Sequence, residues 1–366
     1  PAEGQAKPNP FRTLDPKGRP VESRFSCASA VREVYRTLQE QDDGGEAPRR
    51  AKIRRMYDFF RPFDPDKLKA AGLANLTNVN TGELAGQIDA RAGAINDMAL
   101  DTTDLVELHP LPAELAGPDA ARVATVIAEE FSAVLRGSAE FLPAVATMVR
   151  ECDLYGIGPI GWRDPYDFMP VALERGQVKF PDDASTISSN NELIMVESQF
   201  PAWYLIRLLD NPEKSERMGW NVGAVRDYLK AVFLSGQDTT SQAGNESGTS
   251  VPETLLAHMR QNRLFEVRQF EVLRVIHAYA REVSGERKIT HYIVPTTGGE
   301  DDFLFYKPGA YENMDQCVQW LPYKVTEPYA RSQRGLASAI LPLADVKNRV
   351  FCRIVDAAIN EASQKL

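Results

Sequence analysis

The chain has 366 residues, of which 43% are hydrophobic and 25% are charged, and it carries a formal net charge of −9. This composition is typical of a globular protein and excludes a disordered chain, and the length is enough for roughly two or three domains. The acidic balance argues against a protein that grips nucleic acid through a broad basic surface. It leaves open a protein that surrounds DNA without holding it.

The sequence carries no signal for membrane insertion or secretion. No apolar run approaches the ~18 residues of a membrane-spanning helix, and the N-terminus, which begins at Pro1, lacks the apolar core of a signal peptide. The four cysteines, Cys27, Cys152, Cys317 and Cys352, form no CxxC pair, which favours free thiols in a reducing compartment. We therefore expect a protein that is made in the cytoplasm and does not contact a membrane.

The first third of the chain is expected to be helical after a flexible arm. Residues 1–20 are rich in Pro, Gly and Lys and predict that arm. The apolar residues of 21–41 follow a helical stripe, and 48–60 predict a separate, short basic helix that ends before Pro62.

Further helix signals follow. Asn80, with Glu83 three residues later, is typical of a helix start. Two more helices are expected over 117–135 and 138–154, joined at Gly137.

The middle of the chain changes character to mixed helices and strands. Residues 178–180 and 192–198 predict strands, and Pro201 is well placed at the start of a helix. Another helix fits 221–234. The polar stretch 235–250 predicts a solvated loop.

The last third predicts a β-rich module between helices. A short helix at 252–263 precedes strands over 267–282, 288–294 and 303–306, of which the first two form a hairpin. One long helix over 334–363 ends the chain. Its apolar residues include Leu336, Ile340, Leu343, Val350, Phe351, Ile354 and Ala358, and its polar side carries Lys347, Asn348, Arg353 and Asn360. This order of elements predicts an α+β fold.

Residues 156–161 (GIGPIG) match the GxGxxG pattern of dinucleotide-binding loops. Such a loop follows a strand and opens a helix, so that the pyrophosphate meets free N–H groups at the helix start. Here the preceding residues 144–155 have a helical pattern, and Pro159 removes one of the N–H groups. We therefore interpret the stretch as a turn that ends a helix, and we expect no cofactor.

The other candidates for chemistry are histidines and adjacent carboxylates. His277 and His291 fall on neighbouring predicted strands and could approach each other, but a two-histidine metal site would lack a third ligand. Consecutive carboxylates, at 182–183 and 300–302, point apart in a turn or a strand. We expect neither a metal site nor an enzyme.

A basic cluster lies on the second predicted helix. It comprises Arg49, Arg50, Lys52, Arg54 and Arg55. These side chains cover more than one helix face, so two interpretations stay open. The helix is either solvated beside an acidic neighbour in the chain, or it contacts phosphates or an adjacent acidic subunit.

Three stretches of the sequence carry a resemblance to a known family. The first comprises 49–57 and 73–95 (LANLTNVNTGELAGQIDARAGAI), and the second is 155–180 (YGIGPIGWRDPYDFMPVALERGQVKF). The third, 265–362, contains VIHAYAREVSGERKITHYIV, then YARSQRGLAS and the long helix. In the order and the residue composition of its segments, the chain resembles a phage portal (head–tail connector) protein of the podovirus-like kind, over most of 20–363.

The resemblance implies a structural subunit of the virion. Portal proteins form a ring of about twelve identical subunits at one capsid vertex, made from a repeated contact between two different surfaces. Double-stranded DNA passes through the ring, without sequence specificity, during packaging and ejection. The implied partners are other copies of the chain, the major capsid protein, the terminase of the packaging motor and tail adaptor proteins.

The resemblance also implies a division of the chain. The expected parts are a flexible arm at 1–20, a wing-like helical and α+β domain at 21–250, a first stem-like helix at 251–264, a clip-like β module at 265–330 and a second stem-like helix at 331–366. No crown is recognised after the last helix.

Two groups of basic residues are candidate contact sites. A DNA conduit should hold few cations, because each phosphate that is neutralised resists sliding; Lys347, Arg349 and Arg353 are the candidates for facing the channel. Arg50 and Arg54 are the candidates for an inter-subunit contact. Two alternatives remain open: another virion structural or adaptor protein without a DNA conduit, and an α+β enzyme with a site assembled from scattered residues.

Overall fold

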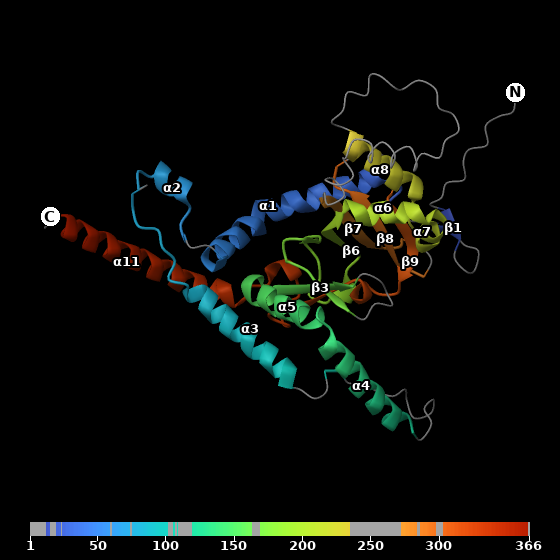
Figure 1. Ribbon diagram of the computed structural model, residues 1–366, viewed down its shortest axis with the longest axis horizontal. Coiled ribbons are helices and arrows are strands. Elements are labelled where there is room, and N and C mark those ends of the chain that lie inside the picture. The colour runs from blue at the N-terminus through green and yellow to red at the C-terminus, as the bar shows by residue number, and fades with distance from the viewer. Residues whose placement is uncertain are drawn as a thin grey trace. The chain divides into compact units, whose positions relative to one another are not determined.

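The computed structural model shows an α+β fold, as the sequence predicts (Figure 1). It describes residues 12–14, 20–22, 24–58, 61–73, 75–101, 105–106, 108, 119–162, 169–234, 272–283, 286–297 and 303–364. The chain divides into two compact units. Unit 1 comprises residues 1–40, 177–181 and 191–314, and unit 2 comprises residues 41–176, 182–190 and 315–366.

Unit 1 is built on a five-stranded antiparallel sheet with the order β5-β6-β7-β8-β9. Its strands are β5 (Val178–Lys179), β6 (Leu193–Pro201), β7 (Val272–Arg281), β8 (Ile289–Pro295) and β9 (Phe305–Tyr311). The predicted hairpin of β7 and β8 and the third strand beside it are confirmed. In addition β7 pairs along its length with β6, from Leu193 opposite Ala280 to Pro201 opposite Val272.

Helices cover both faces of this sheet. On one face lie α6 (Ala202–Asp210) and α8 (Val222–Leu234), whose Leu205 and Leu229 pack with Val275. On the other face the start of α1 packs Val31 against residues of β7 and β8 that point the opposite way, such as Tyr292. Since both faces are covered, β8 is buried at every position, and its sequence (ITHYIVP) does not alternate between apolar and polar residues.

The remaining elements of unit 1 are short. A helix, α7 (Pro212–Met218), lies between α6 and α8 and ends at Gly219. Strands β1 (Arg12–Leu14) and β2 (Pro20–Glu22) pair antiparallel. Part of the stretch that we expected to be a flexible arm therefore forms a two-stranded sheet.

Unit 2 is mainly helical, with a small antiparallel sheet of order β10-β3-β4. Its helices are the later part of α1, α2 (Pro65–Ala70), α3 (Glu83–Asp101), α4 (Ala120–Gly137), α5 (Phe141–Tyr155) and α11 (Leu336–Gln364). Its strands are β3 (Ile157–Trp162), β4 (Pro170–Ala172) and β10 (Val318–Pro322). Helices α3, α5 and α11 contact one another. Their core joins Ile53, Ile88, Leu154 and Ala344 from four helices.

One helix, α1 (Ala28–Asp58), takes the place of the two helices predicted over 21–41 and 48–60. The prediction of a break was wrong, although Pro48 lies inside the helix and removes one N–H donor. An ion pair between Asp42 and Arg50 spans this turn, and Ile53 and Met56 beyond it are buried. Packing and pairing on both sides of the proline outweigh its local cost.

The compact units divide the chain differently from the predicted wing, stem and clip boundaries. Strands β7 to β9, from the predicted clip-like module, share one sheet with β5 and β6 of the predicted wing. Strand β10 pairs instead with β3 in unit 2. The proposed first stem-like helix at 251–264, the polar stretch 235–250 and the carboxylates at 300–302 lie outside the described residues.

The long helix α11 is confirmed, but several of its bulky apolar side chains do not pack within the chain. Its buried side chains are small or polar, namely Ala337, Ala344, Asn348 and Cys352, and Leu336, Ile340 and Leu341 near its start are partly buried against the same core. Asn348, expected on the polar side, is 1% exposed, and its Oδ1 accepts hydrogen bonds from N (2.8 Å) and Oγ1 (2.9 Å) of Thr81. The bulky Leu343, Val350 and Ile354 are 74%, 52% and 62% exposed.

Candidate functional site

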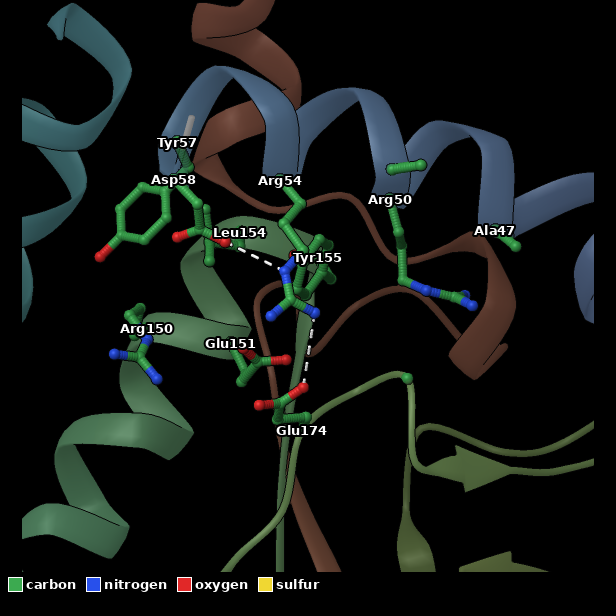
Figure 2. A pocket seen from close by; sticks show the side chains of 12 residues that line it. Ala47, Arg50, Arg54, Tyr57, Asp58, Arg150, Glu151, Leu154, Tyr155 and Glu174 are labelled. Carbon is green, nitrogen blue, oxygen red and sulfur yellow. Dashed lines mark hydrogen bonds and ion pairs between the residues drawn. The ribbon is translucent and has the colours of Figure 1, made fainter. Parts of the chain in front are cut away.

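A pocket of about 340 Å³ lies in unit 2, between α1, α5 and the loop after β4 (Figure 2). Its lining combines guanidinium, carboxylate and phenol groups. The lining residues are Ala47, Arg50, Ala51, Arg54, Tyr57, Asp58, Arg150, Glu151, Leu154, Tyr155, Glu174 and Gly176. The structure thus brings together the two candidate inter-subunit arginines with charged residues that sequence reasoning did not select.

Arg50 and Arg54 both make ion pairs within the chain. The guanidinium of Arg50 donates two parallel hydrogen bonds, of 2.7 Å and 2.5 Å, to the carboxylate of Asp42. Both side chains are largely buried, with 11% of Arg50 and 3% of Asp42 exposed. The Nε of Arg54 donates to Asp58 at 3.0 Å, and a second nitrogen lies 3.7 Å from Glu174 (Figure 2). Reversing the charge of Arg50 would place a second negative charge beside the buried Asp42, so such a variant would destabilise unit 2 whether or not subunits meet there.

Glu151 is the buried acid of the pocket. It is 5% exposed, and its Oε2 accepts a hydrogen bond of 2.7 Å from the backbone N–H of Arg175. Burial raises the pKa of Glu151 to about 7, against the smaller opposing effect of that hydrogen bond. This carboxyl group can therefore take up or release a proton near neutral pH. A sequence pattern does not reveal it, because the cause is enclosure by distant segments.

Arg150 is a third guanidinium, and in Figure 2 it lies between Tyr57 and Glu151. It makes no ion pair within the part of the chain that the structure describes. The lining contains no thiol or imidazole, and burial raises the pKa of the adjacent Cys152 thiol to about 12. The arrangement suits the binding of a small anion or proton exchange through Glu151, rather than attack by a nucleophile.

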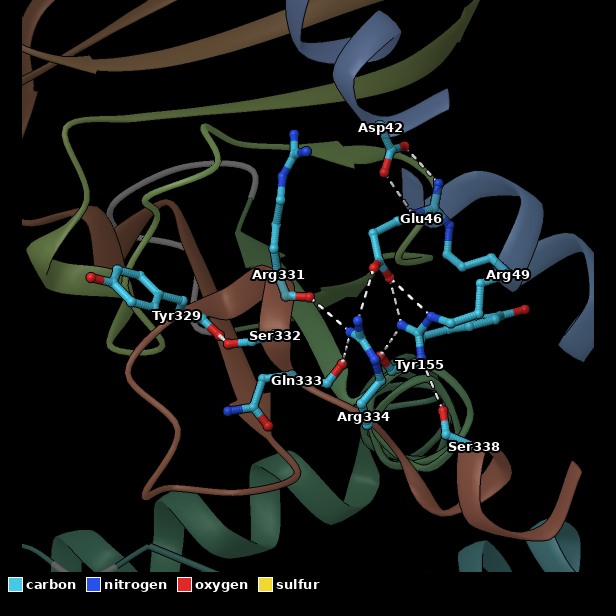
Figure 3. Close-up of polar contacts among 11 residues, drawn as sticks. Asp42, Glu46, Arg49, Tyr155, Tyr329, Arg331, Ser332, Gln333, Arg334 and Ser338 are labelled. Carbon is cyan, nitrogen blue, oxygen red and sulfur yellow. Dashed lines mark hydrogen bonds and ion pairs between the residues drawn. The ribbon is translucent and has the colours of Figure 1, made fainter. Parts of the chain in front are cut away.

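A second polar cluster joins α1 to the loop that leads into α11 (Figure 3). Glu46 accepts from Arg49 at 2.6 Å, and its other oxygen lies 3.3 Å from Arg334. Arg49 also donates to Oγ of Ser338, at 2.9 Å, in the first turn of α11. Gln333 is 1% exposed. Its side-chain amide accepts a hydrogen bond from the backbone N–H of Lys324 and donates one to the backbone carbonyl of the same residue. The stretch YARSQRGLAS thus positions the start of α11.

The three candidate channel residues do not all lie on one side of α11. Lys347 pairs with Glu83 of α3, and Arg349 donates to Asp345 of its own helix at 2.9 Å. Arg353 is exposed and makes no ion pair among the described residues. At 100° per residue, Arg349 and Arg353 share one side of the helix and Lys347 faces elsewhere.

The GxGxxG stretch is a helix end, as predicted, but it then forms a strand. Gly156 ends α5 in the left-handed conformation, with φ of 93°, and residues 157–162 form β3. A dinucleotide loop needs a strand and then a helix, which is the reverse order. A Cβ on Gly158 would lie 1.8 Å from the backbone oxygen of Met148. This glycine is required because β3 runs closely against α5.

The predicted approach of the two histidines is confirmed. Nδ1 of His277 and Nε2 of His291 lie 3.0 Å apart across β7 and β8. Within the described residues no group of three or more His, Cys, Asp or Glu side chains is arranged to hold a metal ion. Asp182, one of the adjacent carboxylates, pairs with Arg331. All four cysteines are free thiols.

No protein-family model matches this chain, and no curated protein sequence matches it. Among the described helices, none combines the length and apolar character needed to cross a bilayer.

Proposed function

We propose that the chain is a structural subunit of a ring-shaped portal at a phage capsid vertex, and that it is not an enzyme. In this proposal the ring, of about twelve copies, conducts double-stranded DNA during packaging and ejection. The capsid protein, the terminase and tail adaptor proteins attach to it. The segment order of the sequence supports this function.

The structural observation that supports it best is the outward apolar side of α11. Leu343, Val346, Val350 and Ile354, which we call the α11 outer stripe, are 74%, 59%, 52% and 62% exposed. Contiguous exposed apolar side chains of this size mark surfaces that bind another protein. A helix of 29 residues with one side in its own core and the other uncovered suits an assembly subunit.

The charges of α11 are compatible with a DNA conduit. Two of its three candidate cations, Lys347 and Arg349, are already paired with carboxylates of the chain. Pairing reduces the number of phosphates that the helix can neutralise, and therefore reduces the resistance to sliding.

Negative-stain images of the purified full-length chain, with masses from mass photometry, test the proposal. We expect rings of about twelve copies with an axial hole. Compact monomers would contradict the assembly, and closed oligomers without a hole would favour the alternative of a virion adaptor protein without a DNA conduit. A chain with Val350→Asp serves as the matched variant, in which we expect the rings to be lost because a charge enters the α11 outer stripe.

A further inference from the structure

A second helix of unit 2 also has an uncovered apolar side. In α4 the residues Val123, Val126, Ile127 and Val134, which we call the α4 outer stripe, are 53%, 51%, 51% and 56% exposed. The opposite side of α4 carries its buried residues, Ala128, Ser132 and Leu135. Helix α4 thus repeats the feature of α11, with one side packed in the unit and an apolar side facing out.

The two outer stripes match in length. The α4 outer stripe extends from residue 123 to 134 and the α11 outer stripe from residue 343 to 354. At 1.5 Å per residue each is about 16 Å long. Positions 123, 126, 130 and 134 of α4, of which 130 is a glutamate, have the same spacing of three, four and four residues as positions 343, 346, 350 and 354 of α11, so the side chains can interdigitate along one seam.

The two stripes cannot cover each other within one copy. Helices α4 and α11 extend away from the α3–α5 region at different ends of unit 2 (Figure 1). Contact between them therefore requires a second copy of the chain.

Charge favours pairing of the unlike stripes over pairing of like ones. The exposed Glu130 lies within the α4 outer stripe, and Arg353 lies beside Val350 and Ile354 in α11. Two α11 stripes packed in parallel would bring arginines close to one another, whereas α4 against α11 can place a carboxylate near a guanidinium.

We propose that the α11 outer stripe of one copy packs against the α4 outer stripe of the next, with Glu130 opposite Arg353. The inference rests on the proposed function for the existence of an assembly, and it names the contact that builds it. Because the two surfaces differ, each copy offers one of each, and the contact repeats head to tail until the ring closes.

Two single variants of the full chain test this contact by complementation. Ile127→Asp blocks the α4 outer stripe, and Val350→Asp blocks the α11 outer stripe. Alone, each variant is expected to stay monomeric in sedimentation velocity. Mixed one to one, they are expected to form dimers and nothing larger, since the mixture retains one intact α4 stripe and one intact α11 stripe.

The controls separate loss of the contact from loss of the fold. Val325→Asp changes a residue that is 84% exposed in unit 2 outside both stripes, and it should assemble like the native chain. Ile127, Val325 and Val350 are each more than half exposed, so the circular dichroism and the thermal midpoint of these three variants should stay at native values. Glu130→Arg and Arg353→Glu should each weaken association roughly tenfold at low salt, and the chain that carries both should recover.

Two results would overturn the inference while leaving the proposed function in place. One is that native rings form and Ile127→Asp also forms rings, which would mean that the α11 outer stripe is covered by another α11 or by a different segment. The other is that the mixed variants form no dimer. A native chain that stays monomeric would overturn both proposals.

Discussion

At the scale of single residues, burial of an acid has the clearest consequence. Glu151 lies beneath α1 and the loop after β4, with one hydrogen bond from the backbone of Arg175. That hydrogen bond favours the ionised form, but removal from water outweighs it, and the pKa rises to about 7. The folded state therefore prefers this group protonated at pH values where the unfolded chain ionises it.

Replacing Glu151 with Gln should change how stability depends on pH. Since the pKa in the folded state is about 7 against 4.5 for the ordinary group, the contribution of Glu151 is most favourable below pH 4.5 and is lost as the pH rises through 7. Gln keeps the hydrogen-bond acceptor and stays neutral. As the pH rises from 5 to 8, urea unfolding should show that the free energy of unfolding of the variant increases by up to about 3 kcal/mol relative to that of the native chain.

The matched variant for this experiment is Glu174→Gln. It changes a carboxylate of the same pocket whose side chain is 53% exposed, and whose charge is one of the causes that raise the pKa of Glu151. We therefore expect its stability to keep the pH dependence of the native chain, with the transition displaced to lower pH. A curve for Glu151→Gln that runs parallel to that of the native chain would show that Glu151 is ionised in the folded state at neutral pH.

At the scale of elements, the β7–β8 hairpin encloses two histidines. Burial lowers the pKa of His277 to about 4 and lowers that of His291 well below its usual value. In the folded hairpin the two imidazoles therefore stay neutral at pH values below about 6.5, where the same groups bind protons in the unfolded chain. The pair packs against aromatic rings, including Phe200 and Tyr279, rather than against carboxylates.

Acid should destabilise this hairpin through His277. A lowered pKa contributes stability above pH 6.5 that is lost as the pH falls toward 4. The glutamine in His277→Gln takes up no proton. Between pH 6.5 and 4 the free energy of unfolding of this variant should therefore fall by about 3 kcal/mol less than that of the native chain. Guanidinium unfolding at several pH values measures the difference. Arg274→Gln, on the same strand but exposed, should behave like the native chain, and equal acid sensitivity of all three proteins would contradict the assignment.

At the scale of the whole molecule, each compact unit has its own core although the chain passes between them repeatedly. Leu205 belongs to the core of unit 1 and Ile88 to that of unit 2, and both are fully buried. Truncating either to Ala should cost about 2–5 kcal/mol, since it leaves a cavity. The cost falls first on the unit that contains the cavity.

Hydrogen exchange can follow this separation. Leu205→Ala should accelerate exchange in the five-stranded sheet of unit 1, and Ile88→Ala should accelerate it in α3, α5 and α11 of unit 2. Val325→Ala, at an exposed position, should leave both patterns unchanged. Equal acceleration in both units by both core variants would show that they unfold as one.

Local periodicity was enough to locate most elements from the sequence. The stripe through Val31 and Leu38, the helix start before Glu83, the helix end at Gly156 and the hairpin that joins His277 to His291 all follow from spacings within one or two elements. Such spacings reflect backbone geometry, which neighbouring residues determine. The side-chain periodicity of a helix or a hairpin can therefore be recognised within its own ten to thirty residues.

Tertiary structure alone decided three further features. It paired β6 with β7 across an interval of about seventy residues, which joined strands that the sequence assigned to separate modules. It continued α1 through Pro48, because packing on either side exceeds the local cost. It enclosed Glu151 between segments that lie far apart in the sequence and so raised its pKa.

The long C-terminal helix shows which features the sequence determines and which features depend on the tertiary structure. The sequence by itself determined that residues near 334–363 form a helix with one bulky apolar side. Only the tertiary structure decided which side packs inward, because close approach to α3 and α5 admits small residues such as Ala344 and a hydrogen-bonded Asn348. The bulky side is thereby left for a contact outside the unit, since a helix can bury large side chains only where its neighbours leave room for them.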